Sequence, residues 1–207
     1  MARETGAQKL ARLTGFDFEW LNKMGAKTLA GIDEVGRGPL AGPVVTACVS
    51  IPLDKAIEGV DDSKKLSETR RESLAPKLKL IATFVKTARV EPEEIDSINI
   101  LNATKRAMEE CACGFNGDLV LVDAVEGLRL NAKIASIIGG DAKSYMIAAA
   151  SIIAKTERDE YMRRMDALYP QYGFARNKGY GTQEHIAAIK KYGPCPIHRL
   201  SFIKHFI

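Results

Sequence analysis

Two adjacent carboxylates, Asp33 and Glu34, stand where an apolar run meets a glycine-rich turn, and Arg37 follows between Gly36 and Gly38. Neighbouring carboxylates repel each other and are costly to desolvate, so a folded site accommodates them best with cations between them. Magnesium and manganese prefer such oxygen ligands. Glycines on both sides of an arginine let backbone amides and a guanidinium approach an anion closely. These residues indicate metal-assisted chemistry on a phosphate.

Two further acids stand at the ends of predicted elements. Asp123 ends the apolar run 118–123, and Asp141 follows two glycines and precedes a long predicted helix. Asp123 would lie beside Asp33 if their strands are neighbours, and Asp141 is expected to be the N-cap of the helix with an oxygen still free for a metal. Since successive strand residues point to opposite faces, Asp33 and Glu34 share a site only if the strand twists or bulges near Gly36. Each acid taken alone could equally be a cap or a solvated strand end.

Two loops have the composition of phosphate or nucleotide contacts. In the segment 62–67, Ser63 and Lys64 could clamp a phosphate, or they could simply lead into a helix cap. In the segment 177–182, Tyr180 between two glycines could stack on a sugar or base, or fill a local core. The glycine-rich turn matches neither the dinucleotide fingerprint nor the P-loop. Three histidines without ligand spacing argue against zinc chemistry, and His198 is expected to be structural.

Hydrophobic periodicity and turn residues predict alternating helices and strands. Ser67 is a plausible N-cap for a helix that runs toward Lys79, and Pro76 is expected to bend or interrupt this helix. The alternation favours an α/β fold with a mixed sheet whose first three strands form a meander. The expected helices are 6–23, 67–79, 99–113, 142–168 and 183–191 with a short turn after Pro92, and the expected strands are 28–33, 43–51, 81–90, 118–123 and 133–138.

The whole-chain composition sets broad limits. With 207 residues, 46% of them hydrophobic, the chain fits one domain with a full core. No apolar run approaches the ~20 residues of a membrane span, and the N-terminus lacks the apolar segment of a signal peptide, so we expect a cytoplasmic protein. A net charge of +4 is compatible with a polyanionic partner without requiring one. The four cysteines are expected to be reduced and structural.

Six motifs, in order from about residue 27 to 203, closely resemble those of bacterial ribonuclease HII. Val35 stands where alanine is more usual in that family, and Arg37 separates the chain from the sister family ribonuclease HIII, which has threonine between the two glycines. The motifs are Asp-Glu-Val-Gly-Arg-Gly-Pro-Leu-Ala-Gly-Pro-Val at 33–44, Asp-Ser-Lys-Lys-Leu-Ser at 62–67, Val-Asp-Ala at 122–124, Gly-Asp-Ala-Lys-Ser at 140–144 with the alanine-rich run 147–159, Asn-Lys-Gly-Tyr-Gly-Thr at 177–182, and His-Arg-Leu-Ser-Phe at 198–202.

The resemblance implies a fold and an activity. The fold would be a ribonuclease H-like mixed sheet flanked by helices, forming a single catalytic domain over 1–207 with a C-terminal helical extension from about residue 165. The activity would be hydrolysis of RNA in RNA–DNA hybrids and incision 5′ of single ribonucleotides in duplex DNA, leaving 5′-phosphate and 3′-hydroxyl ends. The partners would be these nucleic acids and no membrane. The sequence does not indicate an oligomeric state, and a monomer is the default expectation.

The resemblance also assigns residues. Asp33, Glu34, Asp123 and Asp141 would hold two Mg²⁺ or Mn²⁺ ions. Gly36, Arg37 and Gly38 would recognise the ribonucleotide 2′-hydroxyl, and Tyr180 would pack on the sugar at the RNA–DNA junction. Ser63, Lys64, Glu126 and Lys143 would complete the substrate-binding set. Two alternatives remain: another two-metal nuclease of the same fold, such as a junction resolvase, and a non-catalytic protein that binds hybrids.

Overall fold

A five-stranded mixed sheet forms the centre of the protein. The computed structural model describes residues 4–205. The strands are β1 (Leu29–Val35), β2 (Val44–Ser50), β3 (Phe84–Val90), β4 (Leu119–Asp123) and β5 (Lys133–Ile137), arranged in the order β3-β2-β1-β4-β5. The first three strands are antiparallel neighbours, whereas β4 runs parallel to β1 and to β5. The predicted mixed sheet and its opening meander are therefore confirmed.

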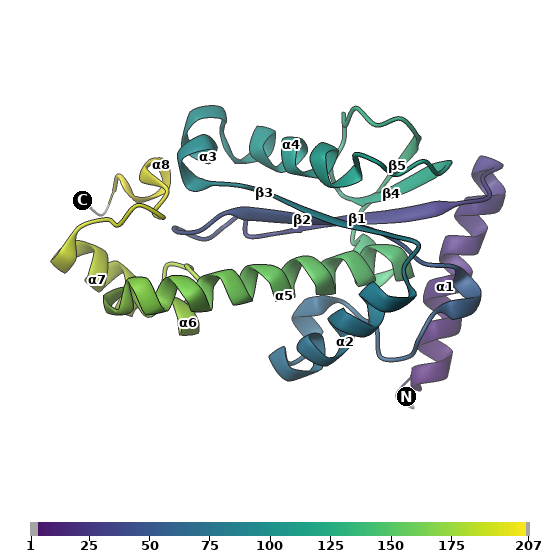
Figure 1. Ribbon diagram of the computed structural model, residues 1–207, viewed down its shortest axis with the longest axis horizontal. Coiled ribbons are helices and arrows are strands. Elements are labelled where there is room, and N and C mark those ends of the chain that lie inside the picture. The colour runs from purple at the N-terminus through teal and green to yellow at the C-terminus, as the bar shows by residue number, and fades with distance from the viewer. Residues whose placement is uncertain (1–3, 206–207) are drawn as a thin grey trace.

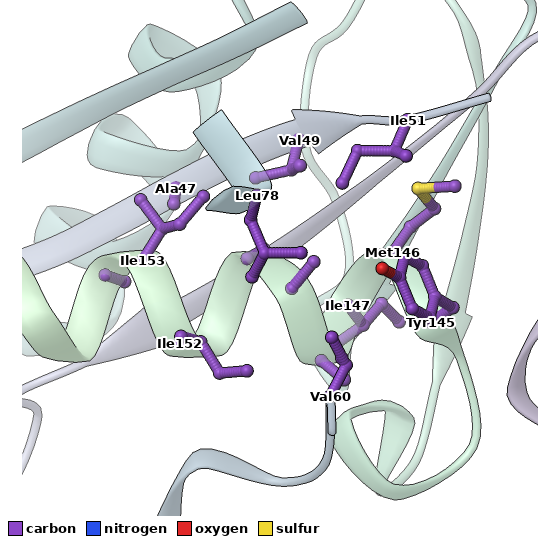
Figure 2. Close-up of a cluster of buried hydrophobic side chains, with 14 of the residues drawn as sticks. Ala47, Val49, Ile51, Val60, Leu78, Tyr145, Met146, Ile147, Ile152 and Ile153 are labelled. Atoms are coloured by element: carbon purple, nitrogen blue, oxygen red, sulfur yellow. The ribbon is translucent and has the colours of Figure 1, made fainter. Parts of the chain in front are cut away.

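Helices cover both faces of the sheet (Figure 1). One face packs against α5 (Tyr145–Leu168), which is flanked by α1 (Gly6–Met24) and α2 (Glu68–Ile81). Figure 2 shows the core on this side, where side chains of β2, α2 and α5 gather, among them Ala47, Val49, Leu78 and Ile153. The other face packs against α4 (Ile100–Ala112), which follows the short helix α3 (Pro92–Ile98). Two apolar layers thus fix the sheet between helices.

The closeness of α5 to β1 depends on one glycine. A Cβ atom built at Gly31 would lie only 2.6 Å from the backbone oxygen of Met146 in α5, so any larger residue would push the helix away. The first turn of α5 therefore lies directly against the strand that carries Asp33 and Glu34.

The C-terminal segments beyond α5 pack with residues of α5 and of the 36–43 loop in a separate hydrophobic cluster. Its elements are the 3₁₀ turn Pro170–Tyr172, α6 (Phe174–Asn177), α7 (Gln183–Tyr192) and α8 (Leu200–Ile203). Further 3₁₀ turns lie at Leu53–Lys55, Ser63–Lys65 and Gly140–Ala142. The division into one domain with an extension from about residue 165 stays a prediction. No helix within residues 4–205 has the length and apolar character needed to cross a membrane.

Two local predictions, an interruption of the helix at Pro76 and an N-cap at Asp141, were wrong. Helix α2 continues through Pro76, which lies on its exposed side, so the carbonyl of Glu72 that loses its helical partner can bond water instead. The N-cap of α5 is Ser144, whose side chain accepts from the backbone N–H of Ile147, and Asp141 lies one turn earlier in a 3₁₀ turn. The pairing of β1 with β2 is regular through Val35, so β1 itself contains no bulge, and the expected re-aiming of a side chain at Gly36 stays a prediction.

Candidate active site

Asp33 and Asp123 lie at the carboxyl ends of adjacent parallel strands. The last aligned pair of β1 and β4 is Ile32 with Val122, and the two acids are the next residues of each strand. Each acid stands two positions after a residue that packs under α5. Because every second residue of a strand faces the same side, both carboxylates leave the sheet on the α5 face. The condition that these strands be neighbours is met, and the parallel register brings the two acids together.

Glu34 leaves β1 on the opposite face, next to Ile32 and Ala30 of the α4-side core. Its Oε1 lies 3.6 Å from the guanidinium of Arg37, three residues along the chain. Its Oε2 is buried without a hydrogen-bond partner. A carboxylate oxygen in that state is expensive to keep unless something else, such as a cation, satisfies it.

Asp141 reaches the same region from the turn after β5. The backbone N–H of the preceding residue, Gly140, donates to Oδ1 of Asp123 at 2.8 Å, which ties this turn to the end of β4. The ammonium of Lys64 lies 3.6 Å from Oδ2 of Asp141. Three separate segments, β1, β4 and the 140–142 turn, therefore contribute the four acids that the sequence predicted.

The protonation equilibria of these acids show that they share one electrostatic environment. Burial, followed by the charge of Glu34, raises the pKa of Asp33 well above its usual range. Burial also raises the pKa of Glu34, although Arg37 opposes this and Asp123 adds to it. The pKa of Asp141 is raised by burial, then by the neighbouring Asp62 and by Asp123. The charge of Asp123 thus contributes to the raised pKa of Asp33, of Glu34 and of Asp141, as expected where carboxylates lie close together.

An all-oxygen donor set of this kind fits hard divalent cations. The unpartnered Oε2 of Glu34 and the mutual repulsion of the acids are the observations that favour such an occupant. Among residues 4–205, no three His, Cys, Asp or Glu side chains are already arranged as a metal site. The four-residue ligand set therefore stays a prediction.

A buried serine pair, which the sequence analysis missed, supports Asp33. Ser151 on α5 forms a hydrogen bond with Asp33 that favours the ionised carboxylate, and its hydroxyl lies 2.8 Å from that of Ser63. Both serines are buried. The hydroxyl of Ser63 thus contacts Ser151, while Lys64 next to it is exposed and available to a ligand.

Two fully buried arginines hold the glycine-rich loop, and the sequence analysis did not identify their role. Arg199 donates to the carbonyl oxygens of Gly36, Arg37 and Gly42 at 2.5–2.9 Å. Burial, followed by repulsion from Arg158, lowers the pKa of Arg199 to about 9. The prediction that the His198–Arg199 segment is structural agrees with these contacts.

Arg158 reaches the loop from α5. It donates to the carbonyl oxygens of Pro43 and Ala41, each at 3.0 Å, and to that of Lys178 at 2.9 Å. Its contacts join the glycine-rich loop to the segment that carries Tyr180. A signal for its burial, but not for its partners, was present in the sequence, because Arg158 continues the inward-facing stripe of α5 that includes Ser151 and Ala154.

Tyr180 lies beside the loop and is 45% exposed. The nearest atom to a Cβ built at Gly38 is Cε1 of Tyr180, 3.9 Å away, and both Arg37 and Gly38 are exposed. The structure therefore brings these three predicted residues into one surface.

Glu126 and Lys143 are less clearly placed. Both are exposed, and Lys143 donates to the carbonyl oxygen of Ile138 at 2.8 Å. Within residues 4–205, no hydrogen bond or ion pair joins either side chain to the four acids. Their substrate-binding roles stay predictions.

The four cysteines at 48, 111, 113 and 195 are all free. Cys48 and Cys111 are buried in the core on the α4 side of the sheet. The expectation of reduced thiols is in agreement with this arrangement.

Solved structures with the same architecture define the class of protein. A ribonuclease H2 from Pyrococcus horikoshii OT3 aligns with a TM-score of 0.72 at 27% identity, over 87% of this chain and 99% of that one. The ribonuclease HII in a structure titled as its complex with PCNA, from Archaeoglobus fulgidus, aligns with a TM-score of 0.73 at 26% identity, over 85% and 94% of the two chains. The chain has the ribonuclease H-like fold.

The family follows from the sequence comparisons. The model of the family described as Ribonuclease HII matches residues 30–205, and the chain belongs to this family of ribonucleases. Ribonuclease HII of Acetivibrio thermocellus is 56% identical over 185 residues, which cover 88% of this chain and 72% of that protein. Ribonuclease HII of Listeria monocytogenes is 47% identical over 94% of this chain and 74% of that protein. A ribonuclease HIII solved in complex with Mn²⁺ shares the fold at 16% identity, with a TM-score of 0.66 over 87% and 68% of the two chains.

Proposed function

We propose that this ribonuclease hydrolyses RNA in RNA–DNA hybrids and incises duplex DNA on the 5′ side of single ribonucleotides, leaving 5′-phosphate and 3′-hydroxyl ends. The observation that carries the proposal is the meeting of four electrostatically coupled acids from three segments beside an exposed glycine-rich loop. Membership of the ribonuclease HII family supports it.

Asp33, Glu34, Asp123 and Asp141 are the residues that would hold two divalent cations, Mg²⁺ or Mn²⁺. When bound, these ions would supply an activated water and stabilise the departing 3′-oxygen. The protein supplies the arrangement: Gly140 orients Asp123 through its N–H, and Ser151 orients Asp33. The buried arginines fix the backbone of the neighbouring loop, so little reorganisation is required when substrate binds.

Recognition of the ribonucleotide is proposed to take place between the loop and Tyr180. The 2′-hydroxyl is the group that distinguishes RNA from DNA. The hydrogen bonds from Arg199 to the carbonyl oxygens of Gly36 and Arg37, which fix the backbone of this loop, support a role for residues 36–38 in bonding it. Tyr180 would pack on the adjacent sugar. Arg37 and Lys64 would contact phosphates, with Ser63, Glu126 and Lys143 in supporting positions.

The test uses a 5′-labelled DNA duplex that contains one ribonucleotide, with Mg²⁺ and with EDTA. We expect a single Mg²⁺-dependent cut on the 5′ side of the ribonucleotide, and ligation or phosphatase treatment of the fragments identifies their ends. The matched control is the same duplex with a deoxynucleotide at that position. Cleavage of the control at an equal rate would exclude recognition of the 2′-hydroxyl and favour a structure-specific nuclease such as a resolvase.

The site assignment is tested by Asp123→Asn against Asp54→Asn. Both changes remove one carboxylate charge, but Asp54 is exposed in the first 3₁₀ turn and contacts none of the four acids. Loss of a metal-ligating charge removes several kcal/mol of transition-state stabilisation, so we expect turnover to fall at least ~100-fold in the first variant, with binding largely retained. Unchanged turnover in Asp123→Asn would refute the site, and binding without hydrolysis in the parent protein would favour a non-catalytic hybrid binder.

Two finer expectations accompany the proposal. We propose that the protein acts as a monomer in the cytoplasm, and the oligomeric state is measured by sedimentation with and without a hybrid duplex. The neighbour solved with PCNA makes a replication clamp one partner to include in that measurement.

A further inference from the structure

Two buried histidines face each other behind Tyr180. Nε2 of His185, on α7, lies 3.0 Å from Nε2 of His198, which belongs to the segment after α7. The other ring nitrogen of His185, Nδ1, lies 2.9 Å from the carbonyl oxygen of Tyr180. Nδ1 of His198 lies 2.9 Å from the backbone N–H of Cys195. Three hydrogen bonds thus connect Cys195 to Tyr180 through two imidazole rings.

The two ends of this chain determine where the protons are. A carbonyl oxygen only accepts, so Nδ1 of His185 carries a proton and its Nε2 is bare when the ring is neutral. A backbone N–H only donates, so Nδ1 of His198 is bare and its Nε2 carries the proton. The contact between the rings then has one donor and one acceptor, with His198 donating to His185.

The reverse arrangement fails at Tyr180. Nδ1 of His198 also lies 3.3 Å from the carbonyl oxygen of Cys195, to which it could donate in the other tautomer. Nε2 of His185 would then have to be the donor, and its bare Nδ1 would face the carbonyl oxygen of Tyr180, lone pair against lone pair, at 2.9 Å. An additional proton on either ring likewise destroys one of the three bonds.

The surroundings keep both rings neutral. Tyr172 and Phe174 pack edge-on against His198 and His185, with ring centroids 4.8 and 5.3 Å apart, respectively. Burial lowers the pKa of His185, and burial together with His185 lowers that of His198 to about 4.

The charged and titratable groups nearby do not offset this burial. Glu93 and Asp96 of α3 line a cavity of about 500 Å³ together with His198 and Cys195. The uncharged thiol of Cys195 lies 3.1 Å from Nδ1 of His198, where it can donate as the backbone N–H does. The carboxylate of Asp96 is already engaged by the backbone N–H groups of Leu200 and Ser201. Arg199, the next residue, directs its guanidinium to the glycine-rich loop.

The chain of hydrogen bonds ends at the substrate surface. His198 forms an isolated β-bridge with Ala41 of the glycine-rich loop, and Leu40 of the same loop donates its N–H to the carbonyl oxygen of Gly179 at 2.8 Å. We propose that His185 and His198 are positioning residues that hold the backbone of Tyr180 next to Gly38 through a one-way hydrogen-bond chain of opposite tautomers. The functional part of this inference rests on the proposed role of Tyr180 in binding the ribonucleotide.

The first test is independent of activity. Long-range ¹H–¹⁵N correlation spectra of the full chain at pH 7 report the tautomer of each histidine, and the spectra of His185→Gln and His198→Gln assign the signals. We expect His185 to be protonated at Nδ1 and His198 at Nε2, both neutral. The same tautomer in both rings, or a charged ring at pH 7, would overturn the proposal.

The second test compares His185→Asn with His185→Gln. The asparagine amide replaces Nδ1–H and can still donate to Tyr180, whereas the glutamine carbonyl replaces Nε2 and leaves Tyr180 without its donor. We expect both variants to lose similar stability, but only His185→Gln to raise KM for the single-ribonucleotide duplex, by roughly fivefold for one hydrogen bond, with kcat less affected. Equal KM values in the two variants would contradict a positioning role.

A double-mutant cycle connects the effect to Tyr180. In a Tyr180→Ala background, His185→Gln should give no further rise in KM, because residue 180 no longer carries the aromatic ring that His185 positions. A full additional rise would refute the proposed route. If Tyr180→Ala alone leaves KM unchanged, the proposed function of Tyr180 fails, whereas the tautomers measured by NMR still confirm or overturn the hydrogen-bond chain.

Discussion

The two glycines that flank Arg37 look equivalent in the sequence, but the structure predicts very different responses to alanine. Gly36 has φ +93°, a region that L-residues rarely adopt. A Cβ atom there would also lie 2.7 Å from Cδ of the buried Arg158 and 2.8 Å from the carbonyl oxygen of Pro43. Gly38 has no positive φ, and its Cβ would meet only Tyr180 at 3.9 Å.

The magnitude for Gly36→Ala follows from two contributions. The unfavourable backbone conformation costs about 1 kcal/mol or more. Displacement of Arg158 breaks at least one of its three hydrogen bonds to carbonyl oxygens, and a hydrogen bond to a charged group is worth ~1.5–3 kcal/mol. The sum is about 3 kcal/mol, which for a chain of this size lowers Tm by roughly 6–12 °C.

The assay is thermal unfolding followed by circular dichroism, with urea unfolding at 25 °C as a second measurement. Gly38→Ala is the matched control and should change Tm by no more than ~3 °C, since the same methyl group is added without strain or overlap. The reasoning is refuted if the two variants melt at the same temperature, or if Gly36→Ala melts within 2–3 °C of the parent protein.

Three further predictions concern buried ionisable groups. Arg199→Lys should lower the free energy of unfolding by about 2–4 kcal/mol in urea titrations, because a lysine cannot reach the carbonyls of the loop with a planar fork; no change would refute the assigned contacts. Burial lowers the pKa of His198 to about 4 in the folded state, so the neutral ring contributes its full stability above pH 6.5. The free energy of unfolding should decline by ~2–3 kcal/mol toward pH 4.5 as the ring is protonated in the unfolded chain, and His198→Gln should lack this decline. Asp17 shows the opposite sign: burial raises its pKa to about 7, so its contribution is full below pH 3.8 and is lost as the pH rises through 7. Asp17→Asn should therefore gain stability relative to the parent protein between pH 4 and pH 8, by up to ~4 kcal/mol, and a pH-independent difference would contradict this.

Much of the fold could be predicted because its signals are local. The helix at 6–24 and the helix after Ser67 follow from apolar spacing and an N-cap, and both were placed within two residues. The five strands follow from short apolar runs bounded by turns. Asp141 shows the limit of such signals, because it precedes the long helix as a cap would, whereas Ser144 three residues later makes the capping hydrogen bond.

The candidate site divides in the same way. The residue types that can bind cations and phosphates, and their positions at the ends of strands, were evident in the chain itself. The roles of Ser151, Arg158 and Arg199 were not, because each depends on a partner more than 100 residues away along the chain or on the opposite side of a packed helix.

The sequence alone therefore determined which groups are present and which elements carry them, since capping, strand alternation and glycine conformation depend on near neighbours. Only the tertiary structure decided which of those groups meet. The parallel register of β1 and β4 sets Asp33 beside Asp123, and the packing of α5 and α7 buries the arginines and histidines behind the loop. The physical reason is that burial and long-range contact, rather than residue type, determine the charge state and the hydrogen-bond partners of these side chains.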